Sequence, residues 1–171
     1  SVRGIVAAIL GRHYTGIDLS SIQIEANQQQ ARDILVEISA YGLPRWIVGD
    51  GRDVQTLALG EYDLLFTCPP YADLEVYSDD PRDLSTMTYP GFLEAYRTII
   101  AASVAMLKQD RFAAVCVGDV RDRKGFYRNF VSDTIAAFQD AGVQLYNEAI
   151  LVTAVGSLSI RVGKQFRAGR K

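Results

Sequence analysis

The chain has 171 residues and a formal net charge of −2, with 49% hydrophobic and 22% charged residues. This length and balance are typical of one globular domain with its own hydrophobic core. The small net charge excludes attraction of nucleic acid by the molecule as a whole, so an anionic partner requires a local basic patch.

The cysteines and the apolar runs exclude further classes. Cys68 and Cys116 are far apart in the sequence and lack the spacing of a zinc site or a disulfide framework, so no metal is expected. The chain has no apolar run long enough to span a membrane and no visible signal peptide. We therefore expect a cytoplasmic protein without a membrane partner.

The first half of the chain predicts two helices and two strands. Residues 2–10 have apolar side chains at helical spacing, and residues 14–19 are of strand type and include Asp18. Ser20 is a helix start with Gln23 as its capping partner, and Gly42 ends that helix. Residues 45–50 form a second expected strand, which reaches Asp50 at its carboxyl end.

The second half predicts three further strands and two helices. Strands are expected over residues 62–67, 112–117 and 144–155, and helices over residues 92–107 and 127–141. The polar, acidic loop from residue 72 to about residue 90 is long for a connector, which favours a mobile lid.

Strands that alternate with helices predict an α/β fold with a mostly parallel sheet covered by helices on both faces. Ligands of such sheets bind beyond the carboxyl ends of the strands. Asp18, Asp50, the segment 68–71 and Asp119 all follow strands in this way. Asp119 lies in a good turn sequence, so we expect it to serve the structure rather than a pocket.

The segment Thr-Cys-Pro-Pro-Tyr at residues 67–71 directly follows an apolar strand. Proline has no amide donor and a fixed φ, so the strand must end here in a stiff loop. Such a segment can be a rigid turn in which Tyr71 simply packs. Its position at the end of a buried strand in an α/β pattern favours a functional loop instead.

These residues are similar to the Asp/Asn/Ser-Pro-Pro-Tyr motif of the DNA amino-methyltransferases, which methylate adenine N6 or cytosine N4. The stretches that lead to Asp18 and Asp50 resemble the family's second and third strands. The resemblance implies a Rossmann-like S-adenosylmethionine-dependent methyltransferase fold. It also implies that residues 1–171 are a single domain clipped at both ends, without its first and last strands, and with a basic tail at 157–171.

The resemblance implies S-adenosylmethionine as cofactor. In the family, the acid after the second strand holds the cofactor ribose and the acid after the third strand contacts its adenine, which are the roles of Asp18 and Asp50 here. Ser1, which resembles the end of the loop before the first helix, and Thr67 complete the expected cofactor set.

The resemblance also implies the catalytic residues, which are Cys68, Pro69, Pro70 and Tyr71. Cys68 and the Pro69 carbonyl would accept hydrogen bonds from the amino group and stabilise the charge that develops during methyl transfer. Tyr71 would stack on a base that has been flipped out of the duplex.

Cys68 departs from the family pattern, and thiol sulfur is a weak acceptor. Its shape is closest to serine, which leans toward the cytosine-N4 branch. Carbon-5 methylation through a thiolate is the alternative, but in that family the nucleophile follows a proline, whereas Cys68 precedes one.

DNA is the expected partner, in a phage or restriction-modification setting. The basic and aromatic segment 121–128, which includes Arg123 and Lys124, is either a contact to phosphates and bases or a solvated loop. The tail adds four further candidate contacts, which are Arg161, Lys164, Arg167 and Arg170.

Two alternatives stay open. The Pro-Pro-Tyr device also serves RNA and protein-glutamine N-methyltransferases, so the substrate can differ while the chemistry stays the same. The chain can also be an inactive module that binds cofactor or nucleic acid, which Cys68 and the missing first strand would explain.

Overall fold

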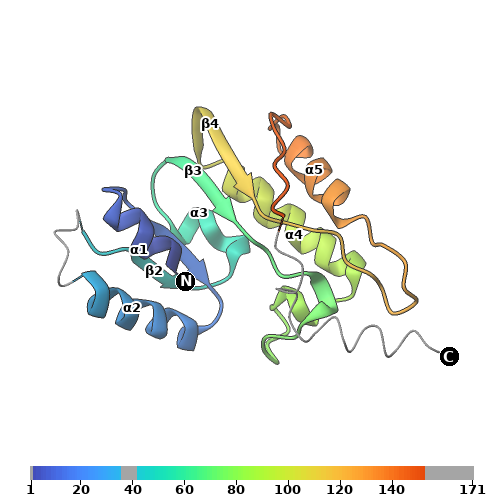
Figure 1. The fold of residues 1–171 in the computed structure, drawn as a ribbon, viewed down its shortest axis with the longest axis horizontal. Helices are drawn as coiled ribbons and strands as arrows, with labels where there is room; N and C mark the ends of the chain where they lie inside the picture. The colour runs from blue at the N-terminus through green and yellow to red at the C-terminus, as the bar shows by residue number, and fades with distance from the viewer. Residues whose placement is uncertain (1, 36–41, 153–171) are drawn as a thin grey trace.

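The computed structural model describes residues 2–35 and 42–152. The helices are α1 (Val2–Ile9), α2 (Ser21–Leu35), α3 (Val54–Leu57), α4 (Tyr89–Val104) and α5 (Phe130–Asp140). The strands are β1 (Thr15–Asp18), β2 (Arg45–Val48), β3 (Tyr62–Thr67) and β4 (Leu107–Val115). Three short 3₁₀ turns are η1 (Gly51–Asp53), η2 (Ala72–Leu74) and η3 (Leu84–Thr86). Helices and strands alternate along the chain, so the predicted α/β class is confirmed (Figure 1).

The strands pair in parallel, as predicted, but not as one sheet. β1 pairs with β2 and β3 pairs with β4, which gives two two-stranded sheets among the residues that the structure describes. The parallel pairing is confirmed, and a sheet that joins the two pairs stays a prediction. Within residues 2–35 and 42–152, each strand has one strand partner.

The β3–β4 ladder contains an irregularity that lengthens β4. Tyr62 pairs with Leu107 whereas Leu64 pairs with Phe112, so the residues 108–111 bulge out of the register, with Asp110 at φ 56. Asp63 binds this bulge through Lys108 at 3.0 Å and Arg111 at 2.9 Å. These two cations lower the pKa of Asp63.

The larger core lies between β3–β4 and the helices α4 and α5. Phe92 is fully buried and its ring lies 5.4 Å from both Tyr96 and Phe130. The buried side chains of α4 are Phe92, Ala95, Tyr96 and Ile100, which recur at the helical spacing that the sequence predicted. On the sheet side, Leu65 and Val115 pack against this cluster.

The smaller core joins α1 and α2 to β2. Its buried residues include Ile5 of α1, Ile24 of α2 and Trp46 of β2. Gly4 permits this approach, because a Cβ atom at residue 4 would lie only 2.7 Å from the Trp46 ring. Helix α1 thus packs closely on the start of the β1–β2 pair.

Some predicted boundaries differ from the observed ones. Helix α4 begins at Tyr89 rather than residue 92, because Pro90 occupies the first turn, where a missing amide costs nothing. The strand predicted over residues 112–117 begins at Leu107 and ends at Val115. The helix predicted over residues 127–141 is confirmed as the shorter α5.

The prediction of a strand over residues 144–155 is wrong for residues 144–152. This stretch is exposed and forms no strand, and residues 153–155 lie outside the described part of the chain. Leu151 and Val152 are each 84% exposed. A parallel strand forms only against a neighbouring edge, and the one recorded aromatic contact here, between Tyr146 and Phe112 of β4 at 5.5 Å, involves side chains and not the backbone.

Within residues 2–35 and 42–152, no helix is long and apolar enough to cross a membrane.

Phe92 tests the larger core. Replacing it with alanine (Phe92→Ala) should lower the free energy of unfolding by about 3–5 kcal/mol, because a large buried ring leaves a cavity. The measurement is urea unfolding followed by circular dichroism. Phe126, which is 69% exposed, is the matched control, and Phe126→Ala should change stability by less than about 0.5 kcal/mol. Equal losses in both variants would contradict this description of the core.

Candidate functional site at the strand ends

The segment 67–71 leaves the sheet where β3 ends. Thr67 is the last residue paired with β4, opposite Val115, and its carbonyl accepts a hydrogen bond from the Cys116 amide at 3.0 Å. Cys68 is exposed and Pro69 is buried. Because Pro69 has no amide hydrogen, the ladder cannot continue past it. The predicted end of the strand is therefore observed.

Tyr71 is held by the larger core. Its ring is half-buried and meets the Phe130 ring edge-on, with the centroids 6.0 Å apart. Burial raises the pKa of Tyr71, so the phenol stays protonated around neutral pH. The packing role considered for Tyr71 is thus present in the structure. A fixed aromatic ring is also what stacking on a base requires.

Cys68 lies among groups that favour its neutral thiol. Partial burial and the neighbouring Cys116 thiol raise the pKa of Cys68 above its usual range, and the Arg3 guanidinium opposes this rise. Arg3 comes from α1 and lies over the Phe66 ring at 5.1 Å. The thiolate that a carbon-5 mechanism needs is therefore disfavoured at this position.

Asp18 ends β1 with one of its oxygens already used. Oδ1 accepts a hydrogen bond from the Ser20 amide at 2.9 Å, and the side chain is exposed. Ser20 in turn caps α2, because its hydroxyl accepts from the Gln23 amide at 3.2 Å. The Gln23 side chain does not complete the capping box, since it donates to Asn27. The other carboxylate oxygen of Asp18 accepts no hydrogen bond from the described residues.

Asp50, the predicted contact to the cofactor adenine, already accepts hydrogen bonds at both of its carboxylate oxygens. It caps η1 through the Arg52 amide, and both of its oxygens accept hydrogen bonds from the Arg52 guanidinium. Arg52 lowers the pKa of Asp50. Arg52 donates to both oxygens of Asp50, so the turn-forming role is the one that the geometry favours.

The loop 119–128, which follows β4, is closed by its own hydrogen bonds. Arg121 and Tyr127 form an antiparallel bridge, and the Arg121 guanidinium stacks on the Tyr127 ring at 4.1 Å. Asp122 accepts from the Lys124 and Phe126 amides, both at 2.9 Å. The predicted contacts Arg123 and Lys124 are exposed on this ordered loop.

Asp119 holds the end of that loop to α5. Its Oδ1 accepts a hydrogen bond from the Val131 amide at 3.1 Å, in the first turn of the helix. This is the structural use that the sequence predicted. Arg128 then lies over the Tyr89 ring at 4.9 Å, which fastens the loop to the start of α4.

The acidic loop before α4 is internally bonded. Ser85 is fully buried and accepts a hydrogen bond from the Tyr77 amide at 3.0 Å, and Asp83 accepts from the Ser85 amide at 2.8 Å. Asp80 forms an ion pair with Arg82. This loop follows Tyr71 directly, as a lid would, and its opening stays a prediction.

Several predicted site residues lie outside the described part of the chain. These are Ser1 and the tail residues Arg161, Lys164, Arg167 and Arg170, which belong to the basic tail 157–171. In residues 2–35 and 42–152, no cluster of three or more His, Cys, Asp or Glu side chains suited to a metal ion occurs.

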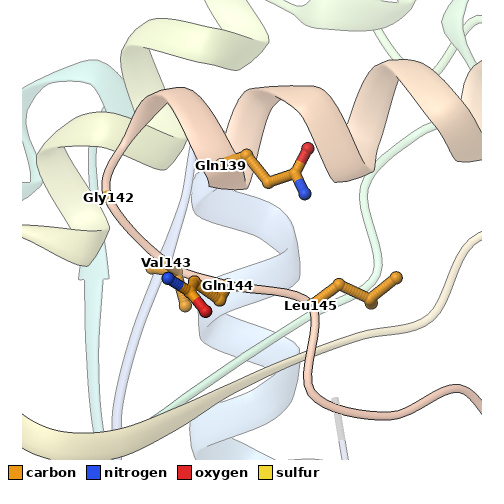
Figure 2. A pocket seen from close by; sticks show the side chains of 5 residues that line it. All are labelled: Gln139, Gly142, Val143, Gln144 and Leu145. Atoms are coloured by element: carbon orange, nitrogen blue, oxygen red, sulfur yellow. The ribbon is translucent and has the colours of Figure 1, made fainter.

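A surface pocket of about 460 Å³ lies at the end of α5, away from the predicted site. Figure 2 shows Gln139 on the last turn of the helix and Gln144 and Leu145 on the segment after it. The lining has no acid, base or nucleophile, so this pocket offers shape and amide groups but no reactive side chain.

The structure thus brings together two groups of predicted residues. Asp18 ends β1 and Asp50 comes after the paired strand β2, and the Gly49 amide donates to the Asp18 carbonyl at 2.9 Å. Cys68 and Tyr71 form the second group, and sequence reasoning missed two of its members, Arg3 and Cys116. Comparing strand ends would have found Cys116, whereas nothing in the sequence marks Arg3.

No protein-family model matches the chain, and neither a curated protein nor a solved structure matches it.

The raised pKa of Cys68 predicts slow alkylation. At pH 7 less of this thiol is ionised than in a free cysteine, so iodoacetamide should modify Cys68 more slowly in the folded than in the unfolded chain. The rate should rise about tenfold per pH unit until the pH passes the raised pKa. Mass spectrometry of the Cys68 peptide gives this rate. Arg3→Ala removes the opposing charge and should slow the reaction further. A folded chain that reacts faster than the unfolded one at pH 7 would contradict the prediction.

Proposed function

We propose that this chain is the core of an S-adenosylmethionine-dependent methyltransferase that methylates an exocyclic amino group of a DNA base. Asp18 would hold the cofactor ribose, and the segment 68–71 would receive the flipped base. The fold would be the Rossmann-like methyltransferase fold. Cytosine N4 and adenine N6 are both candidate targets.

The strand order is the observation that carries this proposal. A Rossmann sheet has the order 3-2-1-4-5-6, so removing strand 1 leaves the pairs 3-2 and 4-5. The structure contains two such parallel pairs, β1–β2 and β3–β4, in that chain order. The unpaired edges of β1 and β3 then correspond to the two sides of the first strand. Asp18 follows the second strand and Cys68 the fourth, where the proposal needs them.

The chemistry at the strand end supports nitrogen as the target. An exocyclic amine is a weak nucleophile that needs acceptors around its hydrogens and no thiolate. Pro69 has no amide of its own, and its buried, stiff position fixes the direction of its carbonyl. A neutral Cys68 thiol beside it fits this task better than carbon-5 attack, which requires the ionised sulfur.

The exposed loop 119–128 supports a nucleic-acid substrate. This loop and the segment 68–71 leave the sheet at the same end, since both follow the carboxyl ends of paired parallel strands. Arg123, Lys124, Phe126 and Tyr127 are all exposed there, which combines cations for phosphates with rings for bases. RNA and protein glutamine remain alternative substrates. An inactive binding module remains the alternative to a methyltransferase.

Transfer of labelled methyl groups tests the function directly. The chain is incubated with methyl-labelled S-adenosylmethionine and, separately, with duplex DNA, single-stranded RNA and a protein extract. Label in DNA, identified by mass spectrometry as N4-methylcytosine or N6-methyladenine, is the expected result. Label in RNA or protein alone would overturn the substrate assignment. Cofactor binding without any transfer would favour the inactive module, and 5-methylcytosine would overturn the nitrogen target.

Variants of Tyr71 test whether its aromatic ring stacks on the target base. Tyr71→Ala should lower kcat/KM for DNA by about 5- to 150-fold, because stacking on one base contributes about 1–3 kcal/mol. Tyr71→Phe keeps the ring and should keep most of the activity. Tyr146, which is 82% exposed, gives the matched control Tyr146→Ala. Circular dichroism shows whether each variant is folded, and full activity in a folded Tyr71→Ala variant would exclude the stacking role.

The loop cations should contribute to DNA affinity. The double variant Arg123→Ala/Lys124→Ala should weaken DNA binding and reduce the dependence of log K on log salt by about one unit for each lost phosphate contact. Fluorescence anisotropy at several salt concentrations measures both. Lys108→Ala/Arg111→Ala makes the same charge change at the β4 bulge and should leave the salt dependence unchanged. Equal effects of both double variants would show that only net charge matters.

A further inference from the structure

The two cysteines, distant in sequence, occupy equivalent positions on neighbouring strands. Thr67 of β3 pairs with Val115 of β4, and the Cys116 amide continues the ladder by donating to the Thr67 carbonyl at 3.0 Å. Cys68 and Cys116 therefore directly follow the last paired residues of two adjacent parallel strands. Such strands lie about 4.8 Å apart, which is within the Cα separation of about 4.4–6.8 Å that a disulfide spans.

The side chains of the two cysteines belong to the same face of the β3–β4 pair. Successive side chains of a strand alternate between faces, and Leu65 and Val115 face the larger core. Cys68 and Cys116 have the opposite parity, which they share with the exposed residues Phe66 and Phe112. Both thiols are free and exposed, so a small oxidant can reach them.

We propose that Cys68 and Cys116 form a reversible intramolecular disulfide. This bond joins the ends of β3 and β4, and it converts the Cys68 thiol so that the segment 67–71 no longer has a free thiol. The chain has two cysteines, so no third thiol of the same chain competes for this bond. An exposed disulfide of this kind is readily reduced again by small thiols. Its effect on methyl transfer rests on the proposed function, whereas its formation does not.

A low-molecular-weight disulfide such as glutathione disulfide is the oxidant. One protein thiolate attacks a sulfur of glutathione disulfide, breaks its S–S bond and releases one glutathione thiolate. The second protein thiolate then attacks the protein sulfur of the mixed disulfide and releases the second glutathione. The two protein protons end on the two glutathione molecules, so the protein dithiol is oxidised and glutathione disulfide is reduced.

The test is to equilibrate the full chain with glutathione redox buffers, block free thiols and analyse proteolytic peptides by mass spectrometry. We expect a cross-linked Cys68–Cys116 peptide that disappears with dithiothreitol. We also expect the folded chain to form this bond at least about tenfold more readily than the chain in urea, because the fold holds the thiols together. Mixed glutathione adducts or disulfide-linked dimers without the cross-linked peptide, or equal formation in urea, would each overturn the proposal.

The variant Cys116→Ser provides the control. It leaves Cys68 in place and should accumulate only the glutathione adduct of that residue. If the chain transfers methyl groups, oxidation should abolish transfer by the natural chain, and dithiothreitol should restore it. An oxidised natural chain that is fully active would overturn the switching effect. Because the cross-link is read by mass, a chain without transferase activity still tests whether the disulfide forms.

Discussion

The parallel pairing of β3 with β4 is the constraint on which the candidate site depends. α4 and α5 cover one face of this pair through Phe92 and Phe130. Because the strands are parallel, the loops after both of them leave the same edge. Pro69 then ends the pairing, since it offers no amide to the ladder. A turn with these prolines away from a parallel pair would have no neighbouring strand end against which to place a thiol and a ring.

The three aspartates at strand ends show why position alone does not assign function. Asp18, Asp50 and Asp119 all follow strands, yet their oxygens are used differently. Both oxygens of Asp50 accept hydrogen bonds from Arg52, and one oxygen of Asp119 accepts from the Val131 amide. One oxygen of Asp18 accepts from the Ser20 amide, and Asp18 is exposed. A carboxylate offers about four acceptor positions, so one that already satisfies several local donors has fewer of them left for a ligand. By this accounting Asp18 is the better candidate of the two acids that the sequence proposed for cofactor binding.

The sequence predicts those features that short-range physics decides. The apolar spacing of α4 and the stop at Pro69 follow from helical geometry and from the chemistry of proline. What it missed depends on distant partners. The residues 108–111 are polar, yet they belong to β4 as a bulge, in which Lys108 and Arg111 bind Asp63. Conversely, residues 144–152 have the composition of a strand, yet they pair with none of the strands that the structure describes. The approach of Arg3 to Cys68 arises from the packing of α1 and has no local signature.

Cys68 is the residue that fits the proposed chemistry least well, and its contact with Cys116 suggests why a cysteine stands there. A thiol is a poorer hydrogen-bond acceptor than the carboxylate, amide or hydroxyl that the amino-methyltransferase motif usually has. Burial and Cys116 also keep it neutral, so its surroundings do not improve it as a nucleophile. Serine at this position would serve acceptance better but could not form a covalent bond with residue 116. The pairing with Cys116 is therefore the feature that distinguishes cysteine from serine here, and it ties the chemistry at the end of β3 to the redox state of both thiols.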